Sequence, residues 1–249
     1  MERKACCTVS ISPVRAESSD SAEIVTQLMF GELIRVIEVK EPWCKIVTET
    51  DAYEGYIDIK HIEFLSDKEA RRWSDGLHYV AEREIAITTD TGRMFICRGA
   101  FIPENESAFS IGKNDYSIST VQKNPFSNIV ELANDYLNTP YLWGGKSPFG
   151  IDCSGLTQTV YRIFEYNLPR DASDQFEHGT EIQFDHAEAG DLAFFENKTG
   201  KITHVGILDG EGKIIHASGH VRSDSFTTEG IVHSKSGELT HKLTKIKRL

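Results

Sequence analysis

The feature that most constrains the fold is a change of pattern near residue 124. Before it, short segments rich in Val, Ile and aromatic residues alternate with turn residues, which is typical of closely spaced strands. After it, apolar residues recur at helical spacing over residues 126–137 and 153–164, and strand-like segments then return. Helices followed by antiparallel strands predict an α+β layer, so we expect an all-β N-terminal region and an α+β C-terminal domain.

The chain has 249 residues, which suffices for two domains, or three if some are small. Residues 1–65 predict a small SH3-like barrel, and residues 66–122 predict a linker followed by a second small SH3-like β domain. Residues 123–249 predict the α+β domain. Asn124 is expected to cap its first helix, with Pro125 at the first helical position.

The charge and the N-terminus limit the partners and the compartment. A net charge of −11 leaves no surplus of Lys and Arg to neutralise phosphates, so we expect no nucleic-acid partner. No run of apolar residues is long enough to span a membrane, so we expect no membrane partner either. The N-terminus has no apolar core of signal-peptide length, which predicts a cytoplasmic protein. A secreted or periplasmic protein whose signal peptide has been removed is the competing interpretation.

One of the five cysteines stands apart from the others. An odd number of cysteines without regular spacing does not indicate a disulfide framework. Cys153, in the segment "GIDCSGL", lies at the start of a predicted helix with Asp152 at the N-cap. The N-terminus of a helix favours the thiolate, which is the nucleophilic form of the side chain. We therefore expect Cys153 to be a catalytic nucleophile.

Two histidines follow on strand-like segments, in "ITHVGIL" and "IIHASG". The turn "LDGEGK" between them predicts neighbouring antiparallel strands, which would bring both imidazoles together above one face of a sheet. His204 is the expected base for the thiol, and His216 is expected to orient His204. A zinc hydrolase that uses these three residues is the alternative, but their spacing matches no zinc motif. We expect no metal and no other cofactor.

Four segments together resemble the NlpC-type cell-wall peptidases, a papain-like family with a Cys-His-His triad. These segments are "PYLWGGKSPFGIDCSGL", "GDLAFF", "THVGIL" and "IIHASG", and the match spans residues 125–249. The upstream segment "GELIRVIEVKEPWCKIV", followed by "YEGYI", resembles bacterial SH3-like domains. This combination is similar to the subgroup that cleaves γ-D-glutamyl-L-diamino-acid bonds, also called dipeptidyl-peptidase VI.

The resemblance implies a role for each residue of the site. Cys153 attacks the substrate carbonyl, while His204 and His216 act as above. The backbone N–H of Cys153 and the hydroxyl of Tyr141 bind the oxyanion, and Tyr141 and Trp143 line the substrate cleft.

Further residues are implied to bind substrate. Asp152 meets the substrate ammonium and Ser154 a backbone polar group, although a plain helix N-cap is the alternative role for Asp152. Asp171 matches another position that binds the ammonium or the backbone. The SH3-like domain is expected to close the cleft, with Glu23 and Tyr56 as its contributions.

The implied substrate is a small murein tripeptide or tetrapeptide with a free N-terminal L-Ala. Its cleavage would release L-Ala-D-Glu during recycling inside the cell. A secreted hydrolase of the intact wall and a non-catalytic peptidoglycan-binding protein are the alternatives. The sequence selects neither Lys nor diaminopimelate at the third position, and it does not give the oligomeric state.

Overall fold

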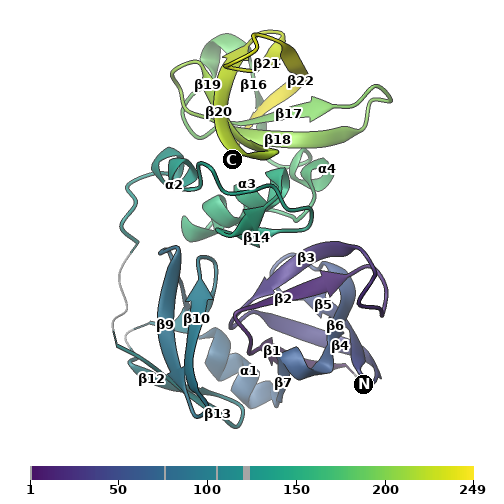
Figure 1. Cartoon of the computed structure of the whole chain (residues 1–249), viewed down its shortest axis with the longest axis vertical. Helices are drawn as coiled ribbons and strands as arrows, with labels where there is room; N and C mark the ends of the chain where they lie inside the picture. Colours follow the sequence, from purple (N-terminus) through teal and green to yellow (C-terminus); the bar gives the residue numbers. More distant parts are fainter. Residues whose placement is uncertain (1, 76, 105, 120–123) are drawn as a thin grey trace. The chain divides into compact units, whose positions relative to one another are not determined.

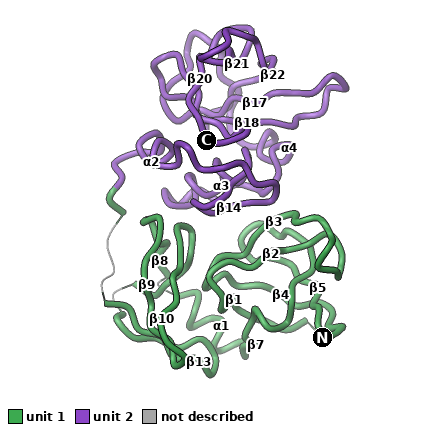
Figure 2. The backbone as a smooth tube through the Cα atoms, viewed as in Figure 1, with its two compact units in different colours: residues 1–125 green, residues 126–249 purple. Residues whose placement is uncertain are grey.

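The computed structural model describes residues 2–75, 77–104, 106–119 and 124–249 (Figure 1). The chain divides into two compact units, residues 1–125 and residues 126–249 (Figure 2). We call them the N-terminal unit and the C-terminal unit. The predicted domain boundary at residue 122 lies outside the described residues.

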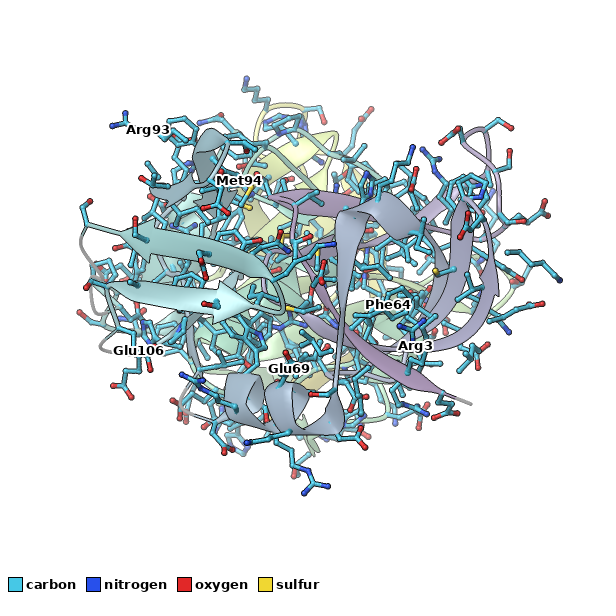
Figure 3. All side chains as sticks on the ribbon, turned by 90° about the horizontal axis from the view of Figure 1, so that it is seen from below. Arg3, Phe64, Glu69, Arg93, Met94 and Glu106 are labelled. Atoms are coloured by element: carbon cyan, nitrogen blue, oxygen red, sulfur yellow. The ribbon has the colours of Figure 1, made fainter. Side chains whose placement is uncertain are left out.

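The N-terminal unit begins with a seven-stranded antiparallel sheet of order β3-β2-β6-β5-β4-β1-β7. The strands are β1 (Arg3–Cys7), β2 (Ile11–Arg15), β3 (Ile24–Met29), β4 (Leu33–Lys40), β5 (Trp43–Thr48), β6 (Glu54–Asp58) and β7 (Ile62–Leu65). The guanidinium of Arg3 on β1 lies over the ring of Phe64 on β7, 3.6 Å from its centroid (Figure 3). The interior side chains come from alternate strand positions, as in any sheet with one buried face.

The rest of this unit is one helix and a smaller sheet of order β10-β9-β13-β12. The elements are α1 (Asp67–Ser74), β8 (Leu77–Tyr79), β9 (Glu84–Thr89), β10 (Gly92–Cys97), β11 (Phe101–Pro103), β12 (Ala108–Ile111) and β13 (Asn114–Ile118). Met29 at the end of β3 and Phe30 directly after it share one buried cluster with Trp73, Ile96 and Phe109. The two sheets of the unit therefore pack on a common core.

The C-terminal unit is a closed antiparallel barrel with helices beside it. The strands are β14 (Lys146–Ser147), β15 (Gly150–Ile151), β16 (Thr180–Ile182), β17 (Leu192–Glu196), β18 (Ile202–Leu208), β19 (Lys213–Ser218), β20 (His220–Thr227), β21 (Gly230–Val232) and β22 (Leu239–Arg248). Strand β22 pairs with both β17 and β21, so six strands from β17 to β22 close on themselves. The fold class predicted from the sequence is confirmed, and closure of the sheet into a barrel adds to it.

Three helices gather on one side of this barrel (Figure 1). They are α2 (Ile129–Asp135), α3 (Cys153–Ile163) and α4 (Ala172–Gln175). Helix α2 is capped by Asn128, whose side chain accepts the Glu131 N–H, so the expected cap at Asn124 is wrong. All eleven residues of α3 are buried, because barrel strands and neighbouring loops surround it. In the described part of the chain, no helix has both the length and the apolarity needed to cross a membrane.

Candidate active site

Cys153 is the first residue of α3, and Asp152 is the N-cap. One oxygen of Asp152 accepts the Gly155 N–H at 2.7 Å, and the other accepts the Gly144 N–H at 2.8 Å. The carboxylate thus ties the start of the helix to the loop before it. The first backbone N–H groups of a helix have no partner inside the helix, so the N–H of Cys153 is a suitable donor for an oxyanion.

The thiol of Cys153 faces strand β18. Its Sγ lies 4.0 Å from the carbonyl oxygen of Thr203, the residue before His204. Burial raises the pKa of the Cys153 thiol to about 11, and the Asp152 carboxylate acts in the same direction. Backbone N–H groups of Val205 and Ser154 act in the opposite direction but do not outweigh burial. The N-terminus of the helix thus acts on the thiol in the expected direction, but burial outweighs it.

The two imidazoles meet as their strand register predicts. In the antiparallel pairing of β18 with β19, Ile207 lies opposite Ile215, which sets His216 opposite Gly206 and diagonal to His204. His204 Nε2 and His216 Nδ1 are 2.8 Å apart, a hydrogen bond between buried side chains. A Cβ at Gly206 would come within 2.9 Å of His216 Cβ, so the glycine makes room for this contact.

Both imidazoles are uncharged at neutral pH. Burial, together with the nearby His216, His241 and Arg222, holds the pKa of His204 well below its ordinary value. Burial also lowers the pKa of His216 to about 4, although the hydrogen bond with Asp224 opposes this shift. The resting site therefore holds a neutral thiol and two neutral imidazoles.

The site contains residues that the sequence analysis did not identify. Asp224 on β20 has its Oδ2 3.1 Å from His216 Nε2. The ring of His241 on β22 stacks on His204 with the centroids 4.3 Å apart. Both residues lie on strands of the barrel that also contains β18 and β19. A hairpin partner for "IIHASG" was the available signal for Asp224, since β19 and β20 are joined by a tight turn.

Arg170 is the third residue that was missed, and it changes the interpretation of Asp152. Its guanidinium pairs with both oxygens of Asp152, at 3.0 and 2.5 Å, and donates to Ser154 Oγ at 2.9 Å. All three side chains are buried. The structure thus shows the N-cap role for Asp152, and the cation that its carboxylate receives is Arg170 of the chain itself.

The remaining predicted residues of the C-terminal unit lie around the thiol or at the surface. Tyr141 is half-buried, and burial together with the nearby Cys153 and Asp152 raises its pKa, so the phenol stays protonated and can donate. Trp143 is 58% exposed on the loop before α3. Asp171 is half-buried and precedes α4.

Glu23 and Tyr56 belong to the N-terminal unit. Glu23 is exposed just before β3, and Tyr56 is half-buried on β6. Their contribution to substrate binding stays a prediction. The structure brings together Cys153, His204 and His216 with the loop of Tyr141, all within the C-terminal unit.

The arrangement is suited to nucleophilic attack on a carbonyl group. A thiol lies beside the strand that carries a neutral imidazole, which can take its proton, and a second imidazole and a carboxylate support the first. The N–H of Cys153 and the hydroxyl of Tyr141 are the available donors for the resulting oxyanion.

Comparison with known proteins identifies this arrangement. Residues 138–238 match the NlpC/P60 family, and residues 14–62 match the bacterial dipeptidyl-peptidase SH3 domain. A gamma-D-glutamyl-L-lysine dipeptidyl-peptidase of Bacillus subtilis is 29% identical over 217 residues, which cover 78% of this chain and 72% of that protein. Dipeptidyl-peptidase 6 of Lysinibacillus sphaericus is 28% identical over 82% of this chain and 83% of its own length.

Solved structures agree at the level of the fold. The crystal structure of an NlpC/P60 family protein from Bacillus cereus superimposes with a TM-score of 0.80 at 19% identity, covering 98% of this chain and 99% of that one. An NlpC/P60 endopeptidase from Photobacterium damselae gives a TM-score of 0.73 at 16% identity, over 97% of this chain and 70% of that one. The chain therefore contains an NlpC/P60 domain at residues 138–238, preceded by a bacterial dipeptidyl-peptidase SH3 domain at residues 14–62.

Proposed function

We propose that this peptidase hydrolyses the γ-D-glutamyl-L-diamino-acid bond of small murein peptides with a free N-terminal L-Ala. The products are L-Ala-D-Glu and a fragment that begins with the diamino acid, and we assign the reaction to peptide recycling in the cytoplasm. The observation that carries the proposal is the buried thiol of Cys153 beside the hydrogen-bonded pair of His204 and His216. The relatives named for γ-D-glutamyl-L-lysine cleavage support the choice of bond.

The reaction follows from the groups present. His204 takes the thiol proton as the sulfur forms a bond to the γ-carbonyl carbon of D-Glu. The oxyanion accepts hydrogen bonds from the Cys153 N–H and Tyr141. The C–N bond then breaks, and His204 returns the proton to the leaving amine. Water, deprotonated by His204, hydrolyses the thioester and regenerates the thiol.

Recognition of the free amine needs a carboxylate. Because Asp152 is already paired with Arg170, we assign this role to Asp171, with Glu23 and Tyr56 of the SH3 domain as the other predicted contacts. Ala172 follows Asp171, and its methyl side chain offers no hydrogen bond to the substrate.

Replacing the nucleophile tests the mechanism. Cys153→Ala is expected to lower kcat for L-Ala-γ-D-Glu-L-Lys by about 10⁴-fold or more, because the other four cysteines are buried in the N-terminal unit. Thermal unfolding of the variant controls for folding. A variant that keeps most of its rate would show that the mechanism is wrong.

Comparing free and N-acetylated L-Ala-γ-D-Glu-L-Lys tests the specificity. Loss of a charged hydrogen bond predicts a kcat/KM about 10- to 100-fold lower for the acetylated peptide. Asp171→Asn is expected to lower cleavage of the free peptide only. Equal rates on both peptides, with release of fragments from intact wall, would favour the secreted wall hydrolase instead.

A further inference from the structure

A carboxylate stands at the inner end of the histidine pair, where the triad does not require one. Asp224 is only 2% exposed, and its Oδ2 lies 3.1 Å from His216 Nε2. The next link, from His216 Nδ1 to His204 Nε2, is 2.8 Å. These three side chains form one continuous hydrogen-bonded chain inside the barrel. The direction of each hydrogen bond decides which nitrogen of His204 is available to the thiol.

The direction is fixed at Asp224. Its Oδ1 accepts the Ser234 N–H at 2.9 Å, and its Oδ2 accepts from Arg222 Nε at 2.7 Å. Burial raises the pKa of this carboxyl, but the donors from Ser234, His216 and Arg222 outweigh burial and hold the pKa below its ordinary value. An ionised carboxylate only accepts hydrogen bonds. His216 must therefore carry its proton on Nε2.

The tautomer of His216 in turn decides the tautomer of His204. With a pKa of about 4, His216 is neutral at pH 7, so a proton on Nε2 leaves Nδ1 as an acceptor. His204 must then donate from Nε2. Because His204 is neutral as well, its Nδ1 holds a lone pair. Among the described residues, no side chain or backbone group forms a hydrogen bond with this nitrogen, so it is left to receive the thiol proton.

We propose that Asp224 is a positioning residue that sets the tautomers of both His216 and His204 and so keeps His204 Nδ1 unprotonated. An amide at this position can donate to His216 Nε2 instead. His216 would then carry its proton on Nδ1 and donate to His204 Nε2, which moves the His204 proton to Nδ1. The nitrogen of His204 that is available to the thiol would then be protonated and could not accept its proton.

The surroundings act on the charge of the pair and do not set its tautomer. His241 from β22 stacks on His204 without a hydrogen bond to it. Arg222 from β20 donates to the backbone of Ser218 and to Asp224, not to either imidazole. Asp224 is thus the one described side chain hydrogen-bonded to the inner nitrogen of His216.

The test is the Asp224→Asn variant of the full chain, measured in two ways. The expected kcat on L-Ala-γ-D-Glu-L-Lys is about 100-fold lower with KM within twofold, as for other residues that orient a catalytic imidazole. The two-bond ¹H–¹⁵N spectrum of the histidine rings is expected to show His204 Nδ1 unprotonated in the wild type and protonated in the variant. A merely structural role would not exchange these two nitrogens.

Asp191→Asn is the matched control. Asp191 is also a buried carboxylate that accepts from an arginine, Arg248, and from a backbone N–H, that of Glu188. It lies outside the histidine chain, so kcat and the His204 signals are expected to stay unchanged.

A protonated His204 Nδ1 in the wild-type spectrum, or an Asp224→Asn kcat within threefold of wild type, would overturn the proposal. The wild-type spectrum decides even where the variant does not fold. The kinetic arm rests on the proposed function, but the ring signals need no substrate, so a failed choice of substrate and a failed role for Asp224 are distinguishable.

Discussion

At the scale of single residues, the resting nucleophile is a thiol and not a thiolate. The N-terminus of α3 favours the anion, yet burial at 5% exposure raises the pKa of Cys153 to about 11. His204 is neutral for the same reason, so the proton moves only when substrate is attacked. The base is therefore expected to act during the attack itself and not merely to hold an ion pair.

Alkylation of Cys153 in the absence of substrate measures this protonation state. The rate of reaction with iodoacetamide is expected to rise about tenfold per pH unit from pH 7 to 9, because the thiolate fraction rises with pH below the pKa. Mass spectrometry of the Cys153 peptide gives the rate. Cys97, 2% exposed with a pKa raised by burial to about 12, is the internal control. A rate that levels off above pH 7 would indicate a resting ion pair.

At the scale of elements, the start of α3 is held by a buried ion pair. Arg170 joins Asp152 at the N-cap to Ser154 in the first turn. Gln175 of α4 adds a hydrogen bond from its amide to the Ser154 carbonyl oxygen at 3.0 Å. These contacts position the nucleophile at the start of α3.

Removing the Arg170 guanidinium should therefore strongly destabilise the start of α3. Arg170→Met leaves the Asp152 carboxylate buried without its partner, and about 3–5 kcal/mol of unfolding free energy is expected to be lost. Urea unfolding measures the change. Lys245→Met breaks the exposed pair with Glu181 and should cost no more than about 1 kcal/mol. Equal losses of unfolding free energy in the two variants would show that the buried ion pair stabilises the fold no more than the exposed one.

The same residues show how much of the site sequence patterns can predict at the scale of elements. Cys153, His204 and His216 were predictable because a helix start and two strands joined by a turn are local signals. For Asp224 the tight turn after "IIHASG" indicated a hairpin partner, but "HVRSDSFT" shows no clear apolar alternation, so the pattern does not say which of its side chains enter the barrel. Arg170 was missed because a charged residue in a loop is normally solvated. Closure of β21 on β22 is a long-range pairing that no local pattern encodes.

At the scale of the whole molecule, stability is linked to pH through the buried histidines. The pKa of His216 is lowered by burial to about 4, below its unfolded value near 6.5. Such a group stabilises the folded state fully above pH 6.5, and the contribution is lost as the pH falls through the folded pKa. His204 acts in the same direction. The lowered pKa of Asp224 acts only below about pH 4, so the two windows are separate.

We therefore expect the unfolding free energy to fall between pH 6.5 and pH 4, with His216 contributing about 3 kcal/mol of the loss. Urea unfolding followed by circular dichroism at several pH values measures the slope. His216→Gln removes this titration and should give a shallower slope over the same window. An unchanged slope in the variant would show that His216 is not buried in its neutral form.

The N-terminal unit is predicted to contribute to recognition of the substrate amine. Glu23→Gln is expected to raise KM for the free peptide severalfold and to leave the acetylated peptide unaffected, because a lost carboxylate weakens only the contact with a cation. Glu38→Gln, an exposed carboxylate on β4 of the same sheet, is the control. An equal change in both variants would remove Glu23 from the site.

Closure of the barrel has a consequence for the timing of activity during translation. Strand β22 completes the barrel by joining β17 to β21, and it also supplies His241, whose ring covers the catalytic base. A nascent chain that still lacks residues 239–248 has its nucleophile and both catalytic histidines but no finished wall behind them. Activity is therefore expected only after β22 has paired with both β17 and β21.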